Sequence, residues 1–171
     1  MPRRSLVIVL LGILAGCTKK TDLAEVTVSA ADGDVFSRFR SELGARFPTE
    51  RLQAFDTAVQ ELKLDAMNRD VVTSEARELD MLGVVNGKSV HAVTLLGWQA
   101  RHARFLREIA LINGMLESDL KLQKKAGSNG PSSTVLARIQ SAKNLIAQLQ
   151  GNADETERRL TELRSVTNQK K

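Results

Sequence analysis

The sequence predicts an all-α fold, in which two long C-terminal helices form an antiparallel hairpin or bundle with shorter N-terminal helices. Three observations indicate this class. Apolar residues recur at alternating steps of three and four along two C-terminal segments, and a stretch of loop-forming residues lies between these segments. The composition is also poor in the aromatic residues that strands favour, with five Phe, one Trp and no Tyr in 171 residues.

The first long segment follows Ser89, a residue type that favours helix N-caps. Its seam consists of His91, Leu95, Trp98, His102, Phe105, Ile109, Ile112 and Leu116. A flanking row widens this apolar face to the breadth of a bundle face, and it comprises Val93, Leu96, Ala100, Ala103, Leu106 and Ala110. The second long segment has a similar seam from Val135 to Thr167, and Gly151, which lies off this seam, allows a break.

Residues 126–132, AGSNGPS, join the two long segments. Because two helices of similar length joined by a short loop fold back on each other, we expect an antiparallel hairpin. The long seams also allow helices of different chains to pair, so the sequence is compatible with a homo-oligomer as well as with a monomer.

Shorter helices are expected before the hairpin and should cover its apolar face. Asp34 is a candidate cap for the first helix, which ends at Phe47-Pro48. Thr49 is a candidate cap for the second, whose seam is Leu52, Phe55, Val59, Leu62 and Ala66. A third helical piece is expected to contain Ala76, Leu79 and Leu82 and to end near Gly83.

The first seventeen residues have the three parts of a secretory signal. Arg3 and Arg4 form a positive start, residues 6–14 are apolar apart from one glycine, and small residues lead into Cys17. Eleven residues separate Ser5 from Cys17, whereas a spanning helix needs about 20. The alternatives are an ordinary signal peptide, or a short retained anchor, with a chance cysteine.

The stretch LAGC, residues 14–17, closely resembles the lipobox of bacterial lipoproteins. The resemblance implies cleavage before Cys17 and acylation of this cysteine, for example with palmitate, which anchors the chain durably when several acyl chains are attached. Thr18 stands where an aspartate would suggest inner-membrane retention, so the resemblance implies the outer membrane, facing the periplasm. The expected organisation is a signal peptide (1–16), lipidated Cys17 with a flexible tether (17–33), a helical domain (34–167) and a cationic tail (168–171). Within the tether, Val26 and Val28 suggest a short extended piece.

The composition narrows the functional classes. Removal of the signal takes away two of the five net positive charges, and such a mild excess does not indicate a nucleic-acid partner. The only cysteine is the candidate lipid site, so no disulfide is expected. No Ser-His-Asp order and no distinct pair of carboxylates indicates catalysis, so the sequence predicts neither an enzyme nor a cofactor.

Two motifs are better explained by structure than by chemistry. GVVNGKSV, residues 83–90, lacks the first glycine of a phosphate-binding loop and a preceding strand, and it reads as a turn before a capped helix. His91 and His102 are about 16 Å apart along a helix, so they cannot share one metal ion. We expect half-buried histidines held by hydrogen bonds, and no metal site.

Two weaker candidates remain. Trp98, Arg101 and Arg104 suggest contact with an anionic ligand, although Glu108 next to Arg104 favours a solvated or helix-bridging face. Lys171, the last residue, resembles the terminal lysine through which the major outer-membrane lipoprotein is bonded to peptidoglycan; the alternative is a frayed cationic tail.

Together these features predict a lipid-anchored helical interaction or scaffold protein of the bacterial envelope, bound to lipid through Cys17 and to an unidentified envelope protein. The alternatives are a tether between outer membrane and peptidoglycan through Lys171, and a binding module for an anionic envelope ligand.

Overall fold

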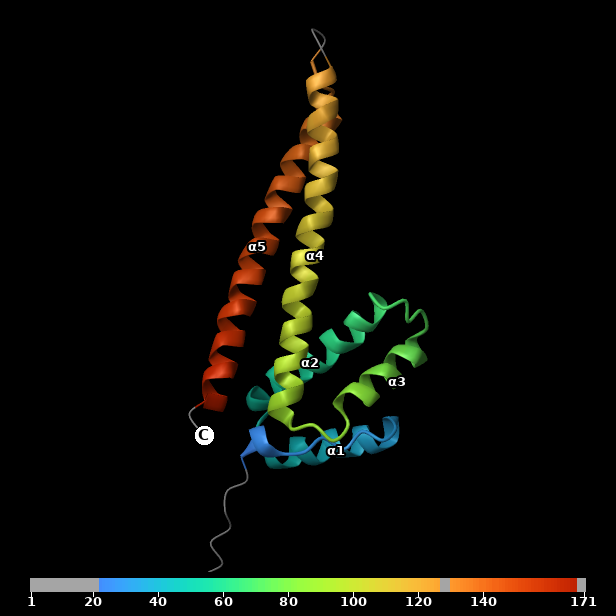
Figure 1. Cartoon of the computed structure of the whole chain (residues 1–171), viewed down its shortest axis with the longest axis vertical. Helices are drawn as coiled ribbons and strands as arrows, with labels where there is room; N and C mark the ends of the chain where they lie inside the picture. The colour runs from blue at the N-terminus through green and yellow to red at the C-terminus, as the bar shows by residue number, and fades with distance from the viewer. Residues whose placement is uncertain (1–21, 127–129, 169–171) are drawn as a thin grey trace, which may run out of the picture.

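The computed structural model describes residues 22–126 and 130–168, and this part of the chain is all-α (Figure 1). A short 3-10 turn, η1 (Leu23–Glu25), precedes the helices. The helices are α1 (Gly33–Arg46), α2 (Thr49–Met67), α3 (Ser74–Val85), α4 (Val90–Lys125) and α5 (Ser133–Asn168). The predicted class is therefore confirmed, and Cys17 and Lys171 lie outside the described residues.

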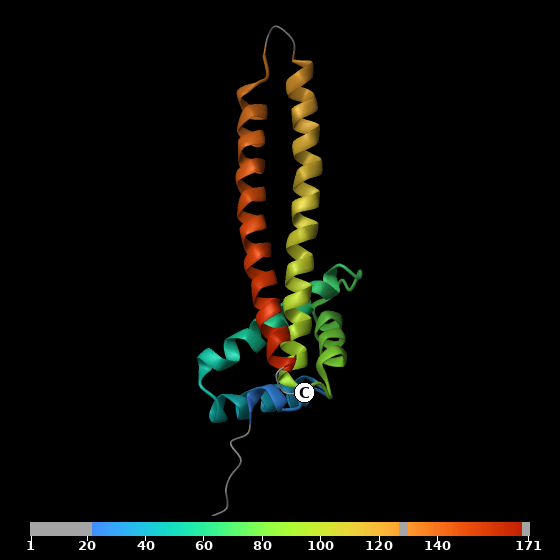
Figure 2. The ribbon, with the colours of Figure 1, turned by 60° about the vertical axis from the view of Figure 1, so that its left-hand side comes forward.

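Helices α4 and α5 pack side by side in opposite directions and form the predicted hairpin (Figure 2). Each has 36 residues, so each is about 54 Å long at 1.5 Å per residue. The predicted seam of α5 is the face that packs on α4, and its buried members are Ile139, Ile146, Leu149, Ala153, Thr156 and Leu160. Helix α5 continues through Gly151 without a break, because the helix on both sides of this exposed glycine packs along α4.

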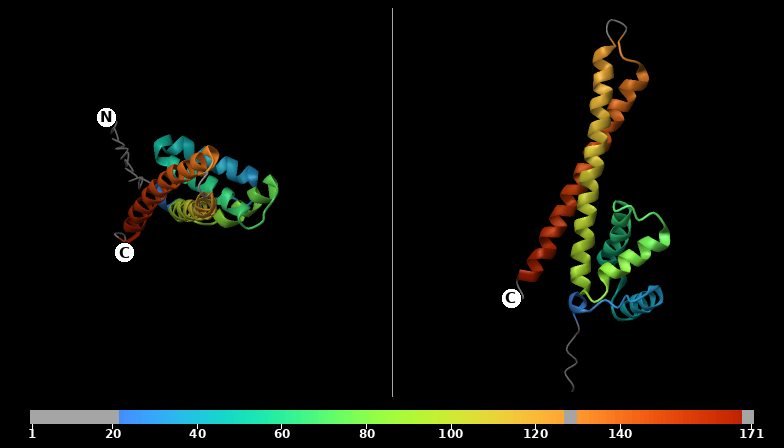
Figure 3. Two further views of the ribbon diagram at one scale, coloured as in Figure 1. Left: turned by 90° about the horizontal axis from the view of Figure 1, so that it is seen from above. Right: turned by 45° about the vertical axis from the view of Figure 1, so that its right-hand side comes forward.

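The short helices surround only one end of the hairpin, which we call the base (Figures 1 and 3). Helix α2 packs on the first half of α4, and α1 and α3 complete this cluster. The expectation that these helices cover the apolar face of the hairpin holds only for the base. Farther along α4, Leu106 and Ala110 of the expected flanking row are exposed.

Three details of the shorter helices differ from expectation. Asp32 rather than Asp34 caps α1, because its extended backbone lets its carboxylate accept from the Val35 N–H at 2.8 Å. Pro48 precedes α2, and Thr49 is the first helical residue instead of a side-chain cap. In α3, Leu79 is 67% exposed while Met81, Leu82 and Val85 are buried, so the helix turns a different face to the core and continues to Val85.

The expected flexible tether is wrong for the described residues before α1. Leu23, Val28 and Ala30 are buried in the base. Thr27 forms an isolated antiparallel bridge with Ser89, and the Val28 N–H donates to the carbonyl of Lys88 at 2.7 Å. The extended piece expected at Val26 and Val28 is therefore present, and it closes the core instead of linking the core to an anchor.

The turn between α3 and α4 has the structure predicted for GVVNGKSV. Gly87 has a positive φ of 74°, a conformation that glycine adopts without strain. The Ser89 hydroxyl accepts from the Ala92 N–H at 3.1 Å and caps α4. Asn86 holds the turn to the N-terminal segment, because its Oδ1 accepts from the Ala30 N–H at 2.9 Å.

Replacing Asn86 with alanine is expected to lower the free energy of unfolding by about 1–2 kcal/mol. The substitution leaves the N–H of the buried Ala30 without its acceptor, and desolvating an unpaired donor costs roughly this amount. Denaturant unfolding measures the difference. Asn144→Ala is the matched control, because Asn144 is exposed and bonds only to Gln140 among the described contacts; equal losses would contradict the role of Asn86.

Candidate functional site

The site is built on the crossing of α2 and α4 at the base. Gly97 of α4 lies against Ala58 of α2 so closely that a Cβ on Gly97 would meet the Ala58 Cα at 2.3 Å. Ala58 is fully buried and Gly97 is buried. The two helix backbones therefore touch at this point. The contact fixes which residues of α2 lie opposite which residues of α4 farther along the two helices.

One turn beyond this crossing, the buried Glu61 joins α2 to two arginines of α4. Its side chain is 6% exposed and accepts two hydrogen bonds from Arg104, at 2.8 and 3.0 Å. Arg104 also donates to Glu108 at 2.9 Å, and Arg101 lies 3.6 Å from Glu61. The hydrogen bonds from Arg104 to Glu61 raise the pKa of Arg104 above its usual value, so this guanidinium stays charged.

Arg101 lies between two aromatic rings of its own helix. Its guanidinium carbon is 5.3 Å from the ring centroid of Trp98 and 5.5 Å from that of Phe105, which suits cation–π attraction. Its Nε is buried without a hydrogen-bond partner. The Trp98 indole N–H donates to the carbonyl of Ala54 at 3.2 Å, which fixes the ring against α2.

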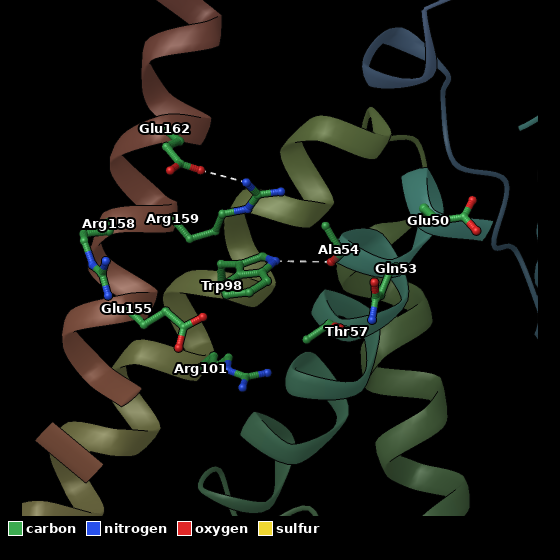
Figure 4. Close-up of a pocket in the computed structure, with 10 residues that line it drawn as sticks. All are labelled: Glu50, Gln53, Ala54, Thr57, Trp98, Arg101, Glu155, Arg158, Arg159 and Glu162. Atoms are coloured by element: carbon green, nitrogen blue, oxygen red, sulfur yellow. Dashed lines mark hydrogen bonds and ion pairs between the residues drawn. The ribbon is translucent and has the colours of Figure 1, made fainter. Parts of the chain in front are cut away.

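A groove of about 460 Å³ lies between α2 and α5 and is floored by Trp98 and Arg101 (Figure 4). Its walls carry both signs of charge. Arg158 and Arg159 of α5 lie between Glu155 and Glu162, and Arg159 pairs with Glu162 at 2.7 Å. The remaining lining residues, from α2, are Glu50, Gln53, Ala54 and Thr57.

The groove is therefore a mixed-charge surface and not a contiguous cationic one. Of the three residues expected to contact an anionic ligand, Trp98 and Arg101 line the groove, whereas Arg104 lies outside its lining. Arg107, which the sequence places nearby, pairs with Asp65 at 3.2 Å. These ion pairs give the arginines a role in joining α2 to α4, which matches the helix-bridging interpretation of this face.

The two histidines lie on the predicted seam without forming a joint site. His102 is half-buried, and its Nδ1 is 3.8 Å from a carboxylate oxygen of Glu157 on α5. His91 is at the start of α4, at the edge of the base. Across residues 22–126 and 130–168, no three His, Cys, Asp or Glu side chains come close enough together to hold a metal ion.

A second surface was missed by the sequence reasoning. A second row on α4 also alternates steps of four and three, and it consists of Gly97, Arg101, Arg104, Glu108, Leu111, Met115, Ser118 and Leu122. Its first members contact α2, but α2 ends at Met67. Beyond that point Leu111 is 68%, Met115 62% and Leu122 52% exposed. We call these three residues the distal apolar row.

The signal for this row is present in the sequence, because the row keeps the same heptad spacing as the seam that packs on α5. It is masked there by the polar residues Arg101, Arg104 and Glu108, which interrupt the apolar pattern. Only the end of α2 separates the covered half of the row from the exposed half.

Comparison with known proteins found no relative of this chain. No family model matches it, and neither a curated protein nor a solved structure matches it significantly. None of the helices within the described residues combines the length and the hydropathy needed to cross a membrane.

Proposed function

We propose that the chain is a lipid-anchored helical interaction protein of a bacterial envelope, tethered through Cys17 and presenting the distal half of the α4–α5 hairpin to a partner. The observation that carries the interaction role is the distal apolar row. Large apolar side chains that are more than half exposed along one helix face are typical of a protein–protein contact surface. The lipid anchor rests on the resemblance of residues 14–17 to a lipobox.

The positions of the chain ends support this arrangement. The described chain begins at Asp22 at the base, and α5 returns to the base at its C-terminal end (Figures 1 and 2). Five residues lead from Cys17 to Asp22 and span at most about 17 Å when fully extended. An acylated Cys17 would therefore hold the base close to the bilayer, while the tip of the hairpin could reach about 54 Å farther from it.

Shape and charge both favour this role over catalysis or small-ligand binding. The groove at the base is open and lined by both arginines and glutamates, and Arg101 on its floor shares Glu61 with Arg104. Ligand sites are more often enclosed and apolar, with a few converging polar groups. Binding of an anionic ligand at Trp98 and Arg101 is therefore a secondary proposal. A cell-wall link through Lys171 is a second one and rests on the sequence resemblance alone.

Replacing Cys17 with serine is expected to abolish lipid attachment and stable retention with membranes. The thiolate is the nucleophile that accepts the acyl-bearing group, and a hydroxyl is far less nucleophilic. Several acyl chains are needed for durable anchoring, so the variant should appear mostly in the soluble fraction or as uncleaved precursor. Mass spectrometry of the mature N-terminus and membrane fractionation measure both effects.

The helical domain gives the control for this experiment, because the described core begins at Asp22 and does not include Cys17. The thermal melt of the variant should match that of the unaltered chain. An unmodified Cys17 in the mature protein, or equal membrane retention of both chains, would contradict the lipoprotein assignment.

A further inference from the structure

The distal apolar row continues an interface that the structure already contains. Two members of the same row of α4 contact α2. Gly97 lies against Ala58, and Arg104 donates hydrogen bonds to Glu61. One heptad beyond Arg104 the same row reaches Leu111, and Met115 and Leu122 follow at steps of four and seven. The face that accepts a helix at the base therefore extends past the end of that helix.

The row has the dimensions of a helix-binding face. Leu111 and Leu122 are eleven residues apart, which is about 16 Å or three turns. Only Ser118 interrupts the apolar side chains, and a small hydroxyl leaves room for close approach of a neighbouring helix. A helix lying along α4 beyond the end of α2 would cover all three apolar side chains at once.

The charged residues near this row indicate what charge a helix that covers it should carry. Between Ile109 and Gln148 the two arms of the hairpin carry five Lys and Arg residues but only two acidic ones. One cation and one anion are used internally, since Arg138 pairs with Asp119. The remaining cations are Lys121, Lys124, Lys125 and Lys143. Of these, Lys121 and Lys125 lie beside the row, three residues after Ser118 and Leu122. The flank of the distal row is therefore cationic.

This excess disfavours a second copy of the chain as the occupant. A symmetric dimer formed through the row would place the same patch on both sides of the contact. Two cationic faces would then meet within about 8–10 Å, the distance over which physiological salt leaves charge repulsion effective. A partner with negatively charged flanks gains from the same charges instead.

We infer that the distal apolar row binds an amphipathic helix of a partner protein whose apolar residues repeat at steps of three and four and whose flanks are acidic. This inference rests on the proposed interaction function and names the chemistry of the partner. The helix lies along α4 beyond the end of α2 and takes the position of a third helix against the hairpin. Apolar contact supplies the binding energy and the lysines set its charge preference.

The test measures binding of labelled synthetic peptides to the full chain by fluorescence anisotropy. One peptide of about three heptads carries leucine at alternating steps of three and four with glutamate at the flanking positions, and a second has lysine in place of glutamate. The glutamate peptide is expected to bind, and the lysine peptide is expected to bind at least about tenfold more weakly.

The double variant Leu111→Gln/Met115→Gln should weaken binding of the glutamate peptide by about tenfold or more, because it removes two large apolar contacts. Leu79→Gln is the matched control, since Leu79 on α3 is 67% exposed and lies outside the row, and it should leave binding unchanged. Both substitutions are at exposed positions, and circular dichroism melts would confirm that the variants fold.

Absent binding of the glutamate peptide, equal binding of both peptides, or equal weakening by the control would overturn the inference. Sedimentation velocity of the full chain supplies a further check: a dimer that the double variant disperses would identify a second copy as the occupant. Peptide binding in solution does not depend on acylation of Cys17, so failure here and failure of the lipid anchor are told apart.

Discussion

Replacing Gly97 with alanine is expected to lower the free energy of unfolding by about 3 kcal/mol. The new Cβ would lie 2.3 Å from both the Cα and the carbonyl oxygen of Ala58, and neither backbone atom can move without shifting α2. Overpacking in a close-packed core typically costs about 1–3 kcal/mol, and a clash with backbone belongs at the upper end of this range. Denaturant unfolding of the variant and the unaltered chain measures the loss.

Gly114 offers a matched control on the same helix, because nothing lies within 4 Å of the position its Cβ would take. Gly114→Ala should stabilise the chain by about 0.5–1 kcal/mol, since alanine favours a helix over glycine. The two substitutions are chemically identical and are expected to have opposite signs. A stabilising or neutral effect of Gly97→Ala would mean that α2 and α4 do not cross where the structure places them.

Replacing Glu61 with alanine is expected to cost about 2–4 kcal/mol. The substitution removes both hydrogen bonds that Arg104 makes to α2 and leaves the charge of Arg104 without its main partner. Breaking a buried ion pair typically costs about 3–5 kcal/mol. The lower range applies here because the side chains of Arg104 and Arg101 are 27% and 32% exposed, so water can solvate them in part.

The control for Glu61 is Glu162, whose ion pair with Arg159 lies at the surface with 64% of the glutamate side chain exposed. Glu162→Ala should change the stability by less than about 0.5 kcal/mol. Thermal melts at low and high salt would separate the two cases further, since a buried pair is screened less than an exposed one. Similar losses for the two glutamates would contradict the role of Glu61 in joining α2 to α4.

The seams allowed the hairpin to be predicted because its two helices meet along nearly their whole length. The buried seam residues of α5 from Ile139 to Leu160 face the partner helix for the same reason, so local periodicity and tertiary packing coincide. The turn before α4 was equally predictable from the sequence. Gly87 adopts the positive φ of the turn and Ser89 caps the helix that follows, and both effects involve only neighbouring residues.

The candidate site was only partly predictable. The sequence singled out Trp98, Arg101 and Arg104 as neighbours on a helix, but their partners Ala54 and Glu61 lie more than forty residues away. A buried glutamate beside a seam of apolar residues has no local signature that distinguishes it from a solvated one. The distal apolar row was missed for a related reason, because its exposure depends on where α2 ends.

The sequence by itself determined the helical class, the two long helices with their connecting loop, and the turn that begins the hairpin. These features follow from periodicity, capping and breaker residues, which act within one or two turns of the chain. Only the tertiary structure decided that residues 23–30 close the core, that Gly97 is the contact between α2 and α4, and that the short helices stop halfway along the hairpin. Each of these features depends on which distant segment of the chain packs against the residues concerned. Such a contact produces no periodic pattern of apolar residues from which it could be predicted.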